Sequence, residues 1–434
     1  MKRLHSYLLK TCLLFMSLLS ISTNALAQSA AETIYDEARI PAYQLPDPLR
    51  FNDATPVKSV ADWTRRRTEL LRLFAENVYG KTPDQKLPKP RVEVTSVEKL
   101  ALGGKATRKE VTVWLSPQHP MRVLMYLPNS AGSKPAPVFL GLNFYGNQAT
   151  NADPGITMAT SWVPEQAANS MSSHRAAEAS RGLDAHQWDV NAMLSRGYGL
   201  VTVYCGDLDP DFHDGYKNGI QPLFYKSGQT KPDSSEWGTV GAWAYGLSRA
   251  MDYLETDPAV DARQVALFGH SRMGKAALWA GAQDLRFAIV ISNESGEGGA
   301  ALARRRIGER IVHLNSRFPH WFCDKFKTFN EREDALPVDQ HELLALIAPR
   351  PLYVASAEDD KWSDPKGEFM GAQAASPVYA LFGLKGLTTT AFPAVNQPVG
   401  GGHIAYHIRT GKHDVTPYDW ARYLDFADTH FKKK

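Results

Sequence analysis

One short stretch of the chain places a serine beside two basic residues at spacings that suit ester chemistry. It reads GHSRMGK, in which Ser271 is followed directly by Arg272 and, four residues after the serine, by Lys275. The apolar run at 264–268 predicts a strand before the serine, and the pattern at 273–283 predicts a helix after it. A serine at such a turn exposes its hydroxyl as a nucleophile, and the next backbone N–H group points to where an oxyanion would form.

The turn departs from the usual motif around such a serine, G-x-S-x-G. Gly269 stands at the first position, but Met273 occupies the place of the second glycine, and Gly274 follows one residue later. A serine that only caps an ordinary helix therefore remains the alternative interpretation.

A serine hydroxyl needs a base to act near neutral pH. Of three histidines near the C-terminus, His413 is predicted to be the base, because it lies in a glycine-led loop just before the last predicted helix. His403 and His407 are interpreted as residues that pack within loops, although each remains an alternative base.

The base needs an acid that orients it, and two carboxylates are candidates. Glu294 follows the predicted strand at 287–292, and Asp360 follows the predicted strand at 350–357. Because parallel strands display catalytic groups at their carboxyl ends, either residue could serve.

Strand patterns alternate with helical patterns along most of the chain. Short alternating runs between about 91 and 143 predict the first strands, and later apolar runs predict strands at 199–205, 264–269, 287–292 and 350–357. Helical patterns include those at 238–255 and 417–431. This rhythm predicts a mainly parallel central sheet with helices on both faces, and with the serine turn it predicts an α/β-hydrolase fold. The long polar connections at 144–198 and 206–236 are predicted to be functional loops.

The N-terminal part of the chain predicts three segments. Residues 1–27 have a basic start, a short apolar run and a final A-L-A, which is typical of a secretory signal peptide and predicts a periplasmic or secreted protein. An uncleaved anchor is the weaker alternative, because the apolar run is shorter than the roughly 20 residues of a membrane span. Residues 28–90 are predicted to form an arm and a helix capped by Ser59, and residues 91–434 the catalytic domain.

The net charge limits the classes of binding partner, and the cysteine count limits the possible disulfides. Cleavage of the signal removes three cationic residues and no acidic ones, which takes the formal net charge from +3 to zero. A mature chain without net charge offers no electrostatic basis for binding nucleic acid or anionic membranes, and we expect a monomer. Cys205 and Cys323 remain, and two buried thiols are favoured over a disulfide.

Several motifs together resemble a known family. The stretches GHSRMGK, SNESGEGGAALARRR, FPHWF, DDKWSDPKGEF and RTGKHDVTPYDW are similar, in that order, to the bacterial branch of the glucuronoyl esterases, carbohydrate esterase family 15. The resemblance covers roughly residues 140 to 430. It implies an α/β-hydrolase that cleaves esters between lignin alcohols and the 4-O-methyl-glucuronic acid side chains of xylan.

The resemblance also implies roles for individual residues. Ser271 would be the nucleophile and Arg272 the oxyanion stabiliser, and the uronic-acid pocket would be lined by Lys275, Glu309 and Trp362. Glu294 matches the acid of fungal members and Asp360 the acid of ordinary α/β-hydrolases and bacterial relatives, so the choice between them stays open. The family often has a cysteine where this chain has His270.

Elementary chemistry agrees with two of these roles. A guanidinium beside the nucleophile can donate hydrogen bonds that strengthen as the oxyanion forms. Lys275 lies one helical turn after Ser271, from where its ammonium could reach hydroxyls of a bound sugar. Glu309 could instead be an exposed helical residue paired with Arg305 or Arg306, in a basic run at 304–306 that is predicted to lie at the surface.

No cofactor and no metal site are predicted, because the three C-terminal histidines show no pattern that converges them with acidic ligands. The expected partner is a glucuronoxylan or lignin–carbohydrate ester. An acetyl or feruloyl xylan esterase of the same fold, and a catalytically inactive carbohydrate-binding protein, remain alternatives.

Overall fold

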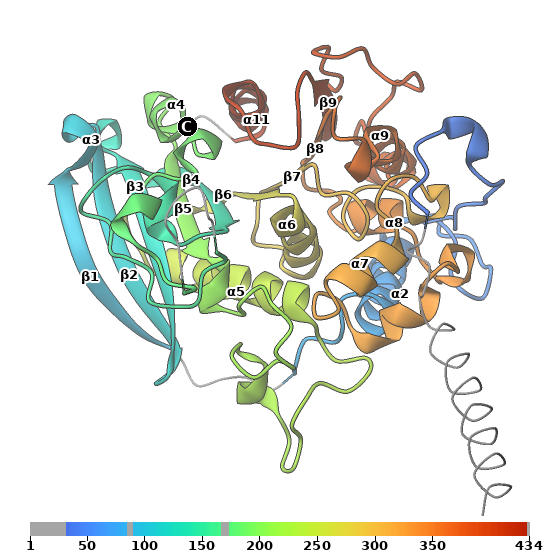
Figure 1. Ribbon diagram of the computed structural model, residues 1–434. Coiled ribbons are helices and arrows are strands. Elements are labelled where there is room, and N and C mark those ends of the chain that lie inside the picture. The colour runs from blue at the N-terminus through green and yellow to red at the C-terminus, as the bar shows by residue number, and fades with distance from the viewer. Residues whose placement is uncertain (1–31, 85–89, 166–172, 432–434) are drawn as a thin grey trace, which may run out of the picture. The chain divides into compact units, whose positions relative to one another are not determined.

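The computed structural model describes residues 32–84, 90–165 and 173–431 (Figure 1). The predicted signal peptide at 1–27 lies outside these residues. Ile34–Lys434 forms one compact unit, so most of the predicted arm belongs to the same unit as the predicted catalytic domain. No helix among the described residues is long and apolar enough to cross a membrane.

A nine-stranded sheet runs through this unit in the order β1-β2-β3-β5-β4-β6-β7-β8-β9. The pairs β1-β2, β2-β3 and β3-β5 are antiparallel, and every neighbouring pair from β5 across to β9 is parallel. The strands are β1 Arg91–Leu100, β2 Ala106–Ser116, β3 His119–Pro128, β4 Ala136–Asn143, β5 Gly199–Tyr204, β6 Val260–His270, β7 Ile289–Asn293, β8 Leu352–Ala357 and β9 Ile404–Arg409.

Helices cover both faces of the sheet (Figure 1). They are α2 Val60–Asn77, α3 Ala101–Gly104, α4 Val190–Ser195, α5 Thr239–Leu254, α6 Arg272–Gln283, α7 Ile311–Arg317, α8 Gln340–Ala345, α9 Pro365–Ala374, α10 Ser376–Leu381 and α11 Pro417–His430. Alternate residues of β6 serve the two faces, because Val265 and Leu267 pack in the core with α5 and α6, whereas Ala266 and Phe268 pack in the core with α4 and α11. The predicted α/β-hydrolase fold is confirmed.

The helix α2 ties the N-terminal segment into the core. It begins after Ser59, whose side chain accepts a hydrogen bond from the backbone N–H of Asp62, as the sequence predicts. Trp63 and Phe74 on one face of the helix are buried. Arg66 of the same helix forms a buried ion pair with Glu342 of α8, 2.8 Å between Nη2 and Oε1.

The last strand, β9, corrects the interpretation of His407 as a residue that packs within a loop. All six residues of β9 are buried, including His407 and Arg409. The ring of His407 contacts the Asp419 carboxylate of α11 at 2.8 Å and the Tyr353 hydroxyl at 2.9 Å. The two basic side chains interrupt the apolar pattern, and partners distant in the sequence make their burial possible. His407 therefore lies in a strand, where its ring is hydrogen-bonded, and not in a loop.

The two remaining cysteines form no disulfide. Cys205 and Cys323 are both free and buried, which is the arrangement that the sequence analysis favoured.

Candidate active site

Ser271 lies at the turn between β6 and α6. Its backbone has φ 55° and ψ −130°, a conformation that residues other than glycine rarely adopt. The backbone N–H of Ser271 donates to the carbonyl of Asn293 at the end of β7, at 2.9 Å, which holds the strained turn in place. The serine is thus presented at the carboxyl end of the parallel strands, where the first turn of α6 supplies N–H groups without intrahelical partners.

Two glycines make this sharp turn possible. A Cβ on Gly269 would lie 2.1 Å from the carbonyl oxygen of Met273, and a Cβ on Gly274 would lie 2.8 Å from Cβ of Ser295. The second glycine is therefore required one residue later than in the usual motif, because α6 packs there against the loop after β7.

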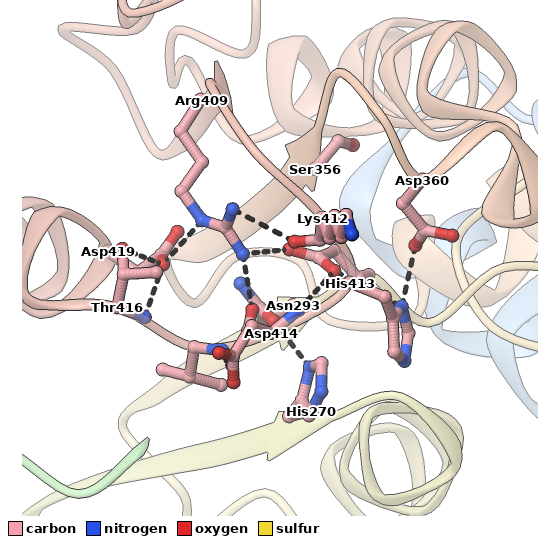
Figure 2. Close-up of polar contacts among 12 residues, drawn as sticks. His270, Asn293, Ser356, Asp360, Arg409, Lys412, His413, Asp414, Thr416 and Asp419 are labelled. Atoms are coloured by element: carbon pink, nitrogen blue, oxygen red, sulfur yellow. Dashed lines mark hydrogen bonds and ion pairs between the residues drawn. The ribbon is translucent and has the colours of Figure 1, made fainter. Parts of the chain in front are cut away.

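His413 directs Nδ1 toward the predicted acid Asp360 (Figure 2), and the other predicted acid, Glu294, approaches the same nitrogen. Nδ1 lies 2.6 Å from Oδ2 of Asp360 and 3.1 Å from Oε2 of Glu294. On the other side, the His413 ring lies 4.6 Å, centroid to centroid, from the ring of His270, the residue before Ser271. The structure thus brings the predicted base and both predicted acids together, with the ring of the base against the residue that precedes the serine.

Burial opposes the charged forms of these three groups. It raises the pKa of the Glu294 carboxyl to about 7. For Asp360, hydrogen bonds from His413 and Ser363 together with the charge of His413 outweigh burial and hold the pKa below its ordinary value. For His413, the hydrogen bonds to Asp360 and Glu294 together with the charges of both carboxylates outweigh burial and raise the pKa of the imidazole. By distance and by charge, Asp360 is the closer partner of His413.

Arg272 is held by an acid that the sequence analysis did not identify. Its Nε lies 2.7 Å from Oδ2 of Asp211, and its guanidinium lies 4.7 Å from the Phe144 ring. The other Asp211 oxygen accepts hydrogen bonds from the rings of His320 at 3.0 Å and Trp321 at 2.7 Å. Burial opposes ionisation of Asp211, but the His320 bond and the charge of Arg272 keep its pKa low. The guanidinium beside Ser271 is therefore oriented by a fixed anion.

The three residues predicted to line a sugar pocket lie together. Nζ of Lys275 donates to Oε2 of Glu309 at 2.9 Å, and Nε1 of Trp362 donates to the other Glu309 oxygen at 3.1 Å. Lys275 also donates to the carbonyl oxygens of Ser295 and Glu297, so all three of its protons have acceptors within the protein. Lys275 thus reaches a ligand through Glu309 rather than directly.

The basic run at 304–306 corrects another expectation, because two of its members are buried. Arg304 bonds Asp339 at 3.1 Å, and Arg305 bonds Asp364 at 2.8 Å. Glu309 pairs with neither Arg305 nor Arg306, and it lies before α7 rather than within a helix. Three consecutive arginines indicate a surface, but their carboxylate partners come from distant parts of the chain.

Three further residues of the site were missed as functional positions. Asp211 lies in the polar connection at 206–236, whose predicted functional role was the available signal. Arg409 opens the stretch RTGKHDVTPYDW and contacts Glu294. His270 contacts Asn293 at 2.6 Å and is kept neutral, because burial and the nearby His413 lower its pKa well below the ordinary value.

The same side chains offer the one three-residue grouping of possible metal ligands found among the described residues. Ligand atoms of His270, Glu294 and His413 lie within 4.8 Å of one another. A metal ion there would have to compete with the guanidinium of Arg409, which lies 2.6 Å from Glu294. Ester hydrolysis by a serine needs no metal.

Comparison with known proteins gives consistent similarities. A family model described as fungal glucuronyl esterase matches residues 220–383. A glucuronoyl esterase structure from Solibacter usitatus is 54% identical, with a TM-score of 0.86, and the match covers 91% of this chain and 100% of that chain.

Two further relatives widen the comparison. The structure of a promiscuous CE15 esterase from a marine bacterial metagenome is 48% identical, with a TM-score of 0.85 and coverage of 92% of this chain and 100% of that one. A 4-O-methyl-glucuronoyl methylesterase from Phanerochaete carnosa is 28% identical over 350 residues, which span 79% of this chain and 73% of that protein.

Proposed function

Because the chain belongs to the glucuronoyl esterases of carbohydrate esterase family 15 and is thus a carboxylic ester hydrolase acting on glucuronic acid esters, we propose that it works through an acyl-enzyme on Ser271. One observation carries the proposal. The strained turn presents Ser271 directly after His270, whose ring lies 4.6 Å from that of His413, and Nδ1 of His413 is held 2.6 Å from Asp360.

The chemical steps follow from these positions. Nε2 of His413 takes the proton of Ser271 as Oγ bonds to the ester carbonyl carbon. The same proton passes to the alkoxide as its bond to that carbon breaks, and the alcohol leaves the acyl-enzyme. His413 then takes a proton from water as the water oxygen attacks the acyl carbon, and it passes this proton to Oγ of Ser271 as the acyl–Oγ bond breaks. The glucuronic acid released loses its own proton to solvent. Asp360 fixes the tautomer of His413 throughout, and Glu294 assists it.

Arg272 is proposed to stabilise the oxyanion of both tetrahedral intermediates. Its pairing with Asp211 orients the guanidinium in advance, so it needs no reorganisation when charge develops. The backbone N–H groups at the start of α6 are proposed as its companions.

The cluster of Lys275, Glu309 and Trp362 is proposed to bind the uronic acid ring. Glu309 offers acceptor oxygens for sugar hydroxyls, and Trp362 offers an aromatic face. Lys275 holds Glu309 in place from the buried side.

The rate should depend on pH through His413. The imidazole acts as a base only when neutral, so kcat/KM should fall as pH decreases through its pKa. Because Asp360 and Glu294 raise that pKa, the fall should begin above pH 6.5, and the apparent value belongs to the coupled cluster. A pH–rate profile between pH 5 and 10 measures this. An active His413→Ala variant beside an inactive His403→Ala variant would show that the base is wrongly assigned.

Replacement of Arg272 by alanine should lower kcat by roughly a hundredfold with little change in KM, because the guanidinium binds the transition state more strongly than the ground state. Arg272→Lys should recover only a small part of the lost kcat, since an ammonium lacks the planar set of donors.

Lys275→Met is the matched variant for Arg272, since it removes a neighbouring cation from the sugar cluster instead. It should mainly raise KM. Steady-state kinetics on benzyl glucuronate separate the two constants, and a pure KM effect at Arg272 would mean that the backbone alone forms the oxyanion hole.

The natural substrate is proposed to be the ester between lignin alcohols and 4-O-methyl-glucuronic acid of xylan, reached by export through the signal at 1–27. The family resemblance supports this choice. An acetyl or feruloyl xylan esterase would share the serine, base and acid but would not need the Lys275–Glu309–Trp362 cluster.

The decisive experiment compares hydrolysis of benzyl glucuronate with that of acetylated xylan. We expect turnover of the former and at least tenfold lower kcat/KM on the latter. A reversed preference would contradict the proposed substrate class. Labelling by a serine-directed fluorophosphonate, with Ser271→Ala as control, distinguishes an active esterase from an inactive carbohydrate-binding protein.

A further inference from the structure

Arg409 at the end of β9 has been given no role so far, although it lies among the residues of the site (Figure 2). We propose that Arg409 is a positioning residue, which keeps Glu294 ionised and directed at His413 and fixes the loop that carries His413. The inference rests on the proposed function, because it assumes that His413 is the base.

The guanidinium of Arg409 donates to five acceptors and is almost fully buried. Nε donates to Oδ2 of Asp419 at 2.7 Å, and Nη2 donates to Oε1 of Glu294 at 2.6 Å. The remaining N–H groups donate to backbone carbonyl oxygens, those of Thr410 at 3.0 Å, Lys412 at 3.0 Å and Asp414 at 2.5 Å. Arginine has five N–H donors in one plane, and no other side chain could occupy this place with all its contacts.

Two of these contacts, with a third bond from the loop to Glu294, hold the loop of the base. The carbonyls of Lys412 and Asp414 belong to the residues on either side of His413, and both point at Arg409. The backbone N–H of Asp414 donates to Oε2 of Glu294 at 3.0 Å. The loop is thus fastened to the guanidinium and to the carboxylate that the guanidinium binds.

The remaining contacts concern charge. Glu294 and Asp360 both approach Nδ1 of His413, which has a single proton to donate. Two buried carboxylates beside one imidazole repel each other unless a cation compensates them. Arg409 supplies that cation to Glu294, and Asp419 in turn anchors Arg409 to α11, through an ion pair in which both side chains are buried.

Among the charged and titratable groups around Glu294, Arg409 is the permanent cation. The acidic and phenolic neighbours can only add negative charge, and the imidazoles of His413 and His270 change charge with pH or stay neutral. These neighbours are His413, Asp360, His270, Arg409, Glu368, Tyr406 and Tyr423, with Asp419 reached through Arg409. Burial raises the pKa of Glu294 to about 7 even with the charge of Arg409 beside it, so loss of that charge should raise the pKa further and leave the carboxyl protonated at neutral pH.

The test uses benzyl glucuronate as substrate and the full-length chain. Arg409→Met should lower kcat by roughly thirtyfold and leave KM within about twofold, because the sugar cluster is untouched. Glu294→Gln in the Arg409→Met background should lower kcat at neutral pH by no more than about twofold further, because without Arg409 the carboxyl is already protonated and no longer accepts the proton of Nδ1. A double variant as impaired as the product of the two single effects would overturn the inference.

Arg350→Met is the matched control. The guanidinium of Arg350 also binds backbone carbonyls, those of Gly281, Asp284, Phe287 and Ile347. It lies near the start of β8, at the amino ends of the parallel strands, whereas the site lies at their carboxyl ends. Its loss should lower thermal stability without changing kcat of the folded protein. A kcat loss like that of Arg409→Met would mean that any broken arginine network has this effect, and it would overturn the assignment.

The pH profile supplies a readout that lost stability alone would not change. Arg409→Met should show a second ascending step above pH 7, where Glu294 ionises, and the double variant should show none. Superimposable profiles would overturn the inference. If Arg409→Met does not fold, the folded yield of the double variant decides, since removal of the unpaired carboxyl should restore it. An inactive wild-type enzyme would refute the proposed function, whereas an active wild type with an unimpaired Arg409→Met would refute only this inference.

Discussion

Replacement of Ser271 by alanine should reduce kcat on benzyl glucuronate by at least about 10⁴-fold, because no other described hydroxyl lies at the turn beside His413. The fold should survive. Alanine adopts the positive φ of this position no worse than serine does, so the melting temperature should stay within a few degrees of the wild-type value. Kinetics and thermal unfolding on the same preparation measure both effects.

Ser271→Gly is the matched control for this prediction. It also lacks the hydroxyl, but glycine relieves a backbone conformation that costs other residues of the order of 1–3 kcal/mol. The glycine variant should therefore be as inactive as the alanine variant and at least as stable. Substantial turnover by either purified variant would refute Ser271 as the nucleophile.

The elements that present the serine could be predicted because their signals are local. The strand before Ser271 and the helix after it follow from hydrophobic periodicity, and α2 follows from periodicity and its capping residue. The carboxyl ends of β7 and β8 place Glu294 and Asp360 at one edge of the sheet, and the structure finds both within 3.1 Å of His413. The place of each acid after a strand of the parallel sheet was enough to predict that the two lie close together.

What could not be predicted depends on partners far apart in the sequence. The strand β9 contains His407 and Arg409, whose burial is possible only because Asp419 on α11 accepts from both. Lys275 was expected to face the sugar, but its three acceptors come from the loops after β7 and before α7. No periodicity signals such pairings, since each is a contact between segments that fold together only in three dimensions.

The choice between the two acids shows the same limit. Both stand directly after a strand, so the sequence left them equivalent. Distances separate them, because Asp360 lies 2.6 Å from Nδ1 of His413, whereas Glu294 lies 3.1 Å away and shares its other oxygen with Arg409. Asp360 is therefore expected to carry more of the orienting interaction.

Single replacements of the acids should leave measurable activity, because each carboxylate can accept the proton of Nδ1 when the other is lost. Asp360→Asn should lower kcat by about a hundredfold and Glu294→Gln by about tenfold, in the order of their distances from Nδ1. The double variant should fall by about 10⁴-fold or more, beyond the product of the two single effects. Steady-state kinetics of all four proteins complete the cycle.

The excess loss in the double variant has a physical reason. With either acid present, His413 keeps the tautomer that leaves Nε2 free to accept the serine proton, and with both gone the amides no longer fix it. The isosteric amides preserve the bond of Glu294 to Arg409, so the loop of His413 should stay in place and the fold should remain intact. Complete loss from Asp360→Asn with no effect of Glu294→Gln would show that a single acid serves, and that Glu294 belongs to the scaffold around Arg409 alone.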